Sequence, residues 1–223
     1  MIEFNEIFSD SDKRVALWCE NVDDTNDLAI MASNIIESKS KLISVPIESV
    51  AEFWACLEKY NPSILTRYNF APINKDFDSI MDDFARTVTN VCKHGANGVQ
   101  IFVKMRDFER FVENLMIIRD DLFFQNSLNI VMDIQDIDMS DMDMLFRKIR
   151  DVRANALTLT LNEDTGMQSD FVGRLYALLQ NWNTTADLHF LLGNNFDRID
   201  QSIRLIECFR PELMEKVRFF LDF

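Results

Sequence analysis

Eight short runs rich in β-branched and aromatic residues recur along the chain, and longer segments with helical spacing of apolar residues separate them. The alternation predicts one strand, one helix and two short connections in each repeat. The predicted strands are Val15–Glu20, Leu42–Pro46, Ser63–Asn69, Gly98–Lys104, Leu128–Gln135, Ala156–Asn162, Asp187–Leu192 and Val217–Asp222. The predicted helices between them are Asp27–Ser38, Ser49–Tyr60, Phe77–Lys93, Phe108–Phe124, Ser140–Val152, Ser169–Trp182 and Arg198–Phe209.

Strands that alternate with helices along a whole chain imply parallel pairing with right-handed crossovers. Eight such strands in 223 residues match the size of a TIM (β/α)₈ barrel. The alternative is an open doubly wound sheet, but NVDDTND follows the first strand where that fold carries a GxGxxG turn. Only five glycines and four prolines occur, so no flexible linker divides the chain. We therefore predict a single TIM-barrel domain over residues 1–223.

The last helix of the barrel is missing from the predicted pattern, because the sequence ends at Phe223, directly after the eighth strand. A strand face that a helix normally covers is then left open. The N-terminal segment contains the apolar residues Ile2, Phe4, Ile7 and Phe8 and can either cover this face or cap the bottom of the barrel. A partner subunit is the alternative cover, and for that reason we expect a homodimer as one arrangement.

Side chains alternate along a strand, so parity separates those that face the helices from those that face the barrel interior. In the sixth strand Leu157, Leu159 and Leu161 must face the helices, which leaves the intervening polar residues inside. The same reasoning points His189 inward on the seventh strand. The inward residues predicted near the carboxyl ends of the strands are polar: Glu20, Arg67, Asn69, Lys104, Asp133, Gln135, Asn162 and Asp222. TIM-barrel chemistry takes place at these ends.

Composition excludes several classes of partner. The net charge of −14 argues against nucleic acid and anionic membranes, which both attract an excess of Lys and Arg. No apolar run approaches the roughly 20 residues of a membrane span, and the N-terminus lacks the basic start of a signal peptide. Four scattered cysteines provide neither zinc-site spacing nor a disulfide framework. We expect a soluble cytoplasmic protein that acts on a small molecule.

Lys104 is the sharpest candidate for chemistry. An inward lysine near the end of a barrel strand, walled by Phe102 and Trp18, is expected to be desolvated, which makes its amine nucleophilic toward a carbonyl. A carboxylate, Asp133 or Glu20, can then move protons with a water in a Schiff-base cycle. The alternative is a structural network in which such charges pair and do nothing more.

This arrangement resembles the class I aldolase superfamily of TIM barrels, especially its transaldolase-like group. IFVKM places Lys104 on the fourth strand, and LWCE places Glu20 at the end of the first, where that group typically has Asp. The resemblance implies a lyase or transferase with Lys104 and Glu20 as catalytic residues, to which the reasoning above adds Asp133; we expect no cofactor. It also implies phosphate binding by loops after strands seven and eight, of which only the first is present, as LLGNN. The predicted substrate-binding residues are Arg67, Asn69, Gln135, Asn162, Gly193, Asn194 and Asp222.

Two other interpretations remain open. Glu20, Asp133, His189 and Asp222 are candidate ligands for a divalent metal, but no HxH or HExxH spacing supports this and Lys104 would repel a cation, so we predict no metal. The second interpretation is a barrel with no catalytic role that acts as a binding or interaction module. Short predicted loops with few glycines favour it, because TIM-barrel enzymes place their function on those loops.

Overall fold

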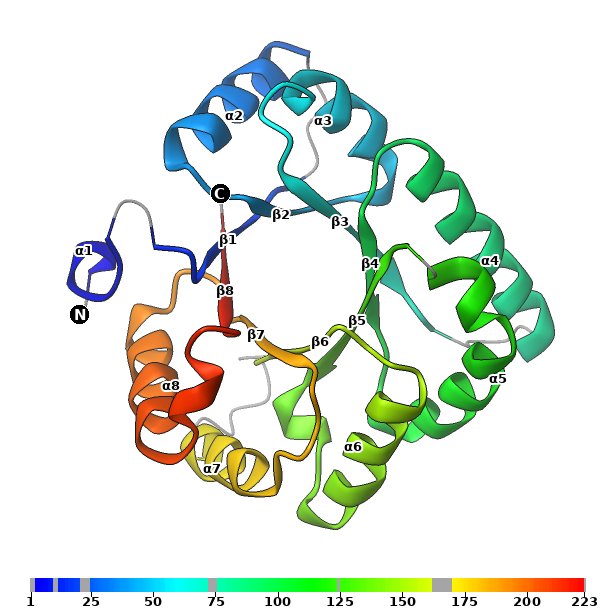
Figure 1. The fold of residues 1–223 in the computed structure, drawn as a ribbon, viewed down its shortest axis with the longest axis vertical. Helices are drawn as coiled ribbons and strands as arrows, with labels where there is room; N and C mark the ends of the chain where they lie inside the picture. The colour runs from blue at the N-terminus through cyan, green and yellow to red at the C-terminus, as the bar shows by residue number, and fades with distance from the viewer. Residues whose placement is uncertain are drawn as a thin grey trace.

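Eight parallel strands pair in chain order and close into a barrel, in which β8 pairs with β1 (Figure 1). The computed structural model describes residues 3–9, 12–20, 25–71, 76–123, 125–161 and 170–222. All eight predicted strands are confirmed, with ends that move by one or two residues. They are β1 (Val15–Trp18), β2 (Leu42–Val45), β3 (Ser63–Asn69), β4 (Gly98–Phe102), β5 (Ser127–Asp133), β6 (Ala156–Thr160), β7 (Asp187–Leu191) and β8 (Arg218–Asp222).

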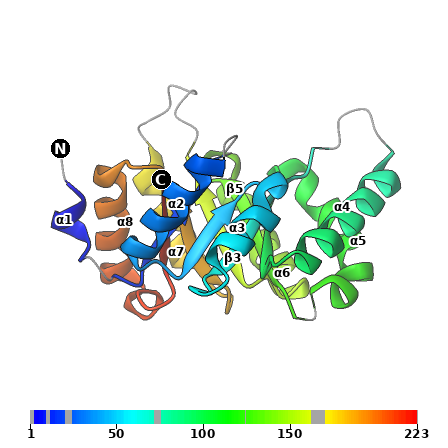
Figure 2. The same ribbon diagram turned by 90° about the horizontal axis from the view of Figure 1, so that it is seen from above.

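A helix lies between each pair of consecutive strands and packs on the outside of the barrel (Figures 1 and 2). These seven helices are α2 (Thr25–Ser38), α3 (Val50–Leu57), α4 (Phe77–Lys93), α5 (Met105–Phe123), α6 (Met142–Asp151), α7 (Phe171–Asn181) and α8 (Phe196–Phe209). Each corresponds to a predicted helix, and α4 has the predicted bounds. Within the described ranges, none of the helices combines the length and apolarity that crossing a bilayer requires.

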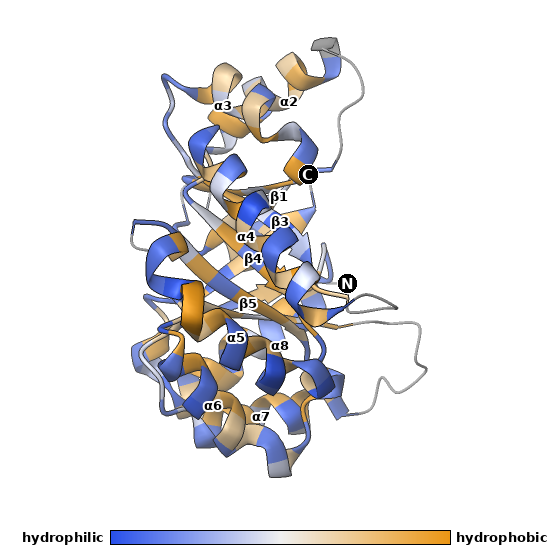
Figure 3. Ribbon diagram, turned by 90° about the vertical axis from the view of Figure 1, so that its right-hand side faces the viewer, coloured by the Kyte–Doolittle hydropathy of each residue, from blue (hydrophilic) through white to orange (hydrophobic). Residues whose placement is uncertain are grey.

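Alternation along the strands separates two layers of side chains, as predicted. Leu157, Leu159 and their counterparts on the other strands join the helices in one large buried core. The opposite set, with Ala16, Leu65 and Phe220 at its centre, fills the barrel interior. Figure 3 shows hydrophobic residues along the strands and a mixture of hydrophobic and hydrophilic residues along the surrounding helices.

The barrel interior also holds polar side chains, but the fully buried ones carry no charge. They are Ser44, Gln100, Asn129, Thr158 and His189. The Ser44 hydroxyl donates a hydrogen bond to the Gln100 side-chain oxygen. The prediction that Glu20, Lys104 and Asp222 line the interior is wrong, because all three side chains are exposed. Burying a neutral hydrogen-bonding group costs far less than burying an ion, which explains the distribution.

The open face beside β8 and β1 is covered by the N-terminal segment, as predicted. A short helix, α1 (Phe4–Ile7), lies against α8 in the space between α8 and α2 (Figure 1). Phe8 is buried, with its ring centroid 5.8 Å from that of Phe219 on β8, and Phe4 contacts Phe196 on α8. Ile2 lies outside the described residues. Because the N-terminal segment covers this face, no partner subunit is needed there. The homodimer stays a prediction.

Gly98 lets three strands approach one another, which predicts a large cost for Gly98→Ala. A Cβ atom at this position would lie 2.5 Å from the Ser127 carbonyl oxygen and 3.0 Å from a Leu65 methyl group. We expect overpacking to lower the free energy of unfolding by about 1–3 kcal/mol, measured by urea denaturation. Gly173→Ala is the control, because Gly173 is exposed on α7 and its nearest neighbour is the mobile end of Asp170; this variant is expected to gain up to about 1 kcal/mol. Equal effects of the two substitutions would contradict the packing argument.

The buried imidazole of His189 predicts a loss of stability in acid. Burial, assisted by repulsion from Arg218, lowers the pKa of His189 from 6.5 to about 3. Between these values the unfolded chain binds one proton more than the folded chain, so the free energy of unfolding falls as pH falls, by about 1.4 kcal/mol per pH unit. Urea denaturation from pH 7 to pH 4 is expected to show this slope reduced in His189→Gln. The exposed His94 supplies the control His94→Gln, and an unchanged slope in His189→Gln would refute the assignment.

Candidate functional site

Two aromatic rings form a floor across the barrel below its carboxyl-terminal mouth. Trp18 at the end of β1 and Phe102 at the end of β4 meet edge to face, with ring centroids 6.0 Å apart. Trp18 packs on the interior cluster of Ala16, Leu65 and Phe220. The two rings therefore lie between the mouth and the interior cluster.

Arg67, an inward residue of β3, lies on this floor. Its guanidinium carbon is 3.9 Å from the centroid of the Trp18 ring, and it donates a hydrogen bond to the backbone carbonyl of Cys19. Burial lowers the pKa of Arg67, and the nearby carboxylate of Glu20 opposes this shift. Burial also raises the pKa of the Cys19 thiol to about 12, so this cysteine is a packing residue and not a nucleophile.

The ends of β7 and β8 bring a second group of predicted residues together. Gly193 has a positive φ of 58°, and a Cβ atom there would lie 2.8 Å from the Asp222 carboxylate, so glycine lets that carboxylate pack on the turn. Asn194 donates from its amide to the Asp222 carbonyl oxygen at 3.3 Å. Burial and repulsion from Glu20 both raise the pKa of Asp222. Glu20, Arg67 and Asp222 thus belong to one electrostatic group.

A cavity of about 260 Å³ opens beside this group. It is lined by Trp18, Leu161, Leu191, Leu192, Gly193, Asn195, Arg198 and Asp222. Asn195 caps α8 by accepting a hydrogen bond from the Arg198 backbone N–H at 3.2 Å, which places the Arg198 side chain in the first turn of the helix. The cavity therefore combines an aromatic ring, a carboxylate and a guanidinium at one mouth of the barrel.

Lys104 stands on the β4 side of the same mouth. Val103 packs in the helix-facing core, so alternation leaves Lys104 on the mouth side of the chain. Its side chain is exposed. The expected desolvation by Phe102 and Trp18 is therefore wrong, because β4 ends at Phe102 and Lys104 lies two residues beyond the strand, above the floor.

Asp133, at the end of β5, is the nearest predicted carboxylate to Lys104 along the barrel. β4 and β5 pair with Phe102 opposite Val131, and the Val103 N–H continues the pairing by donating to the Val131 carbonyl at 3.2 Å. The register therefore places Lys104 and Asp133 at the same level. Asp133 is half-buried and caps the turn that follows, since its Oδ1 accepts a hydrogen bond from the Gln135 N–H at 2.9 Å.

The remaining predicted residues lie in different places. Asn69 is exposed at the end of β3, and Gln135 is half-buried beyond the end of β5. Asn162 lies outside the described residues. His189 is deep in the barrel, level with Arg218 at the start of β8, and so it does not join Asp222 at the end of that strand. In the part of the chain that the structure covers, no three His, Cys, Asp or Glu residues are grouped closely enough to hold a metal ion.

Sequence reasoning missed Arg198 and the role of Trp18. Arg198 had a signal, because it follows an Asn-capped turn at the start of a predicted helix. No pattern in the sequence indicates the stacking of Arg67 on Trp18, because the two residues come from strands that are not neighbours in the barrel.

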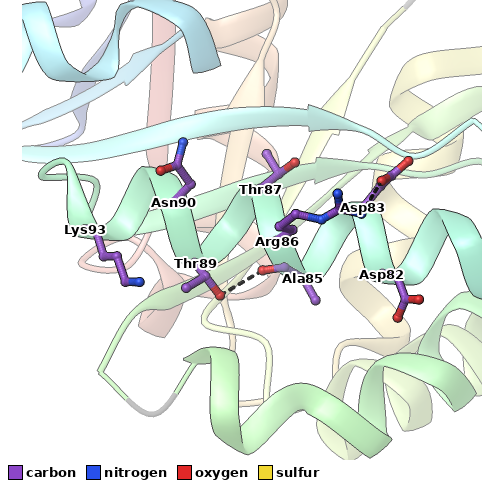
Figure 4. Close-up of a pocket in the computed structure, with 8 residues that line it drawn as sticks. All are labelled: Asp82, Asp83, Ala85, Arg86, Thr87, Thr89, Asn90 and Lys93. Atoms are coloured by element: carbon purple, nitrogen blue, oxygen red, sulfur yellow. Dashed lines mark hydrogen bonds and ion pairs between the residues drawn. The ribbon is translucent and has the colours of Figure 1, made fainter.

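A larger surface hollow, of about 1050 Å³, lies away from both mouths on the outside of α4 (Figure 4). Its lining residues all belong to this helix, and Figure 4 shows Arg86 paired with Asp83 and the Thr89 hydroxyl donating to the Ala85 carbonyl. No strand end contributes to it. We therefore place the candidate site at the carboxyl-terminal mouth.

Comparison with solved structures places this fold among aldolases and other TIM-barrel enzymes. The aldolase QR15 has a TM-score of 0.68 and 9% identity, with 96% of this chain and 92% of that chain covered. Deoxyribose-phosphate aldolase from Aeropyrum pernix, described as tetrameric, has a TM-score of 0.65, 7% identity, and coverage of 95% and 85%. A homocysteine methyltransferase from Escherichia coli reaches 0.63 at 9% identity, with coverage of 96% and 91%.

No protein-family model matches the chain, and no curated protein matches its sequence. At identities this low, the structural likeness establishes the fold and not the reaction. The chain therefore has the closed eight-stranded TIM-barrel fold that several aldolases share.

Proposed function

We propose that the protein is a small-molecule lyase or transferase of the class I aldolase type, acting on a carbonyl substrate through a Schiff base on Lys104. The observation that supports the proposal is the β4–β5 register, which puts Lys104 and Asp133 at the same level at the carboxyl ends of two paired strands. The aldolases among the structural neighbours support the same chemistry at the level of the fold.

In the proposed reaction the Lys104 amine adds to the substrate carbonyl carbon, and loss of water forms an iminium ion. Asp133 accepts the proton of the substrate's β-hydroxyl group. The adjacent carbon–carbon bond then breaks, its electron pair moves to the iminium nitrogen, and an aldehyde leaves. Protonation of the remaining enamine and addition of water release the second product and free the lysine. Glu20 is the second carboxylate in reach of the mouth.

The substrate proposed is a short hydroxylated carbonyl compound, such as a sugar phosphate. The cavity of about 260 Å³ is small and combines the apolar Trp18 ring with polar groups. We propose that an anionic end binds at the Gly193–Asn195 turn, beside Arg198 and the amino-terminal end of α8. The carbonyl end would then extend across the floor toward Lys104.

A non-catalytic binding module is the second candidate function. The exposure of Lys104 favours it, because the protein itself does not desolvate the amine. Arg67 also already has partners in the Trp18 ring and the Cys19 carbonyl. On this alternative, the mouth binds a ligand without a covalent step.

Borohydride trapping separates the two candidates. The protein is incubated with sodium borohydride together with one carbonyl compound at a time: acetaldehyde, dihydroxyacetone phosphate or glyceraldehyde 3-phosphate. Adducts are then mapped by peptide mass spectrometry. We expect one carbonyl compound to modify Lys104 at least tenfold more than the other lysines, because reduction fixes an iminium as a stable secondary amine. Lys104→Arg should abolish this adduct.

Lys59→Arg is the matched control, since Lys59 is exposed outside the barrel, and it should leave the adduct unchanged. Asp133→Asn should still form the adduct but cleave the substrate about 10²-fold more slowly, because it loses only the proton acceptor. An adduct spread evenly over exposed lysines, or none with any of the three compounds, would leave the non-catalytic module as the function.

A further inference from the structure

A second cavity, of about 450 Å³, opens at the amino-terminal mouth of the barrel, at the opposite end from the proposed active site. It lies among the beginnings of β2, β3, β5, β6 and β7. Its lining includes Ser63, Ser127, Asn129, Arg153, Asp187 and His189. A cavity of this size accommodates a small ligand.

The hollow exists because the inward side chains at the strand beginnings are small. Ser63, Ser127 and Ala156 occupy these positions on three strands, where larger residues would fill the barrel. The floor of the hollow is closed by Leu65, which packs on Phe220 in the interior cluster. The cavity is therefore separate from the carboxyl-terminal mouth and does not share its residues.

The deep wall of the cavity is polar and uncharged, and one of its polar atoms lacks a hydrogen-bond partner among the described residues. His189 is 5% exposed, and its Nδ1 atom finds no hydrogen-bond partner among the described residues. Its imidazole is neutral, because burial and Arg218 lower its pKa to about 3. Asn129 is 2% exposed and lines the same wall. Buried polar atoms are nearly always paired, so an unpaired one on a side chain that lines a cavity points to a ligand or water at this site.

The charged residues that line the cavity favour neither an anion nor a cation as its ligand. Arg153 and Asp187 carry opposite signs, and Arg153 is exposed at the edge. Arg218 approaches His189, but its guanidinium donates to the backbone carbonyls of Glu215 and Val217. An ion that entered the cavity would lose its hydration against a neutral wall, which is unfavourable. A ligand with many hydroxyl groups would instead pair with serine, amide, imidazole and carboxylate groups together.

From this cavity and its unpaired histidine, we propose that the amino-terminal mouth is a binding site for a small uncharged polyhydroxylated molecule, of the size of a monosaccharide or a shorter polyol. His189 and Asn129 bind its hydroxyl groups at depth, and Ser63, Ser127 and Asp187 bind those nearer the opening. The site is independent of the lyase activity proposed for the other mouth.

The test uses the imidazole signals of His189 in long-range ¹H–¹⁵N spectra of the full chain. The chain has two histidines, so the spectrum of His94→Gln assigns the signals. Glycerol, erythritol, xylitol and glucose are titrated to 50 mM, with glucose 6-phosphate as the charged comparison. We expect at least one neutral compound to shift the His189 signals saturably and to leave those of His94 in place.

Ser127→Val places methyl groups in the hollow and is expected to weaken this binding at least tenfold. Ser63→Val, on the β3 side, serves the same purpose if Ser127→Val does not fold. The control is Ser33→Val, on the exposed face of α2, which should bind as the unmodified protein does. The proposal is overturned if no neutral compound gives a saturable shift, which would mean that the cavity holds only water. It is also overturned if glucose 6-phosphate binds and glucose does not, or if both filling variants bind normally.

Discussion

Closure of the barrel is the constraint on which the rest of the structure depends. Once β8 pairs with β1, each strand has one face toward the helices and one toward an interior of fixed width. The helix-facing side is largely apolar, because the surrounding helices cover it. Most polar residues of the strands then lie in the interior or at the strand ends, and the buried Thr66 of β3 is an exception. The molecule uses both places, neutral groups inside and charged groups at the ends, because the free energy of burying an ion is much less favourable than that of burying an amide or a hydroxyl.

This division produces two mouths of different chemistry. At the carboxyl end, Arg67 and Asp222 are partly desolvated, and both interact with the exposed carboxylate of Glu20. At the amino end, small residues leave a hollow whose wall is neutral. The first environment suits chemistry that develops charge and exchanges protons. The second suits binding of an uncharged molecule by hydrogen bonds.

The sequence predicted the barrel, its strands and the facing of each strand, because all three follow from the period of the apolar residues. It did not predict where the strands stop. β1 ends at Trp18 and β4 at Phe102, so Glu20 and Lys104 lie two residues beyond their strands and are exposed, whereas continued strands would have buried them. The sequence also did not predict how deep His189 lies in the barrel. Its depth depends on the stagger between strands, which brings the third residue of β7 level with the first residue of β8.

The proposed reaction requires that Lys104 be exposed at the carboxyl-terminal mouth, and competitive labelling of the lysines with trace acetic anhydride measures this exposure directly. Lys59, exposed outside the barrel, and Lys148, which is 8% exposed and lies 3.2 Å from Glu113, provide internal standards for open and enclosed amines. The account predicts that Lys104 is acetylated at least as fast as Lys59. Acetylation as slow as that of Lys148 would contradict it, because the side chain would then be enclosed among the helices and could not reach a substrate.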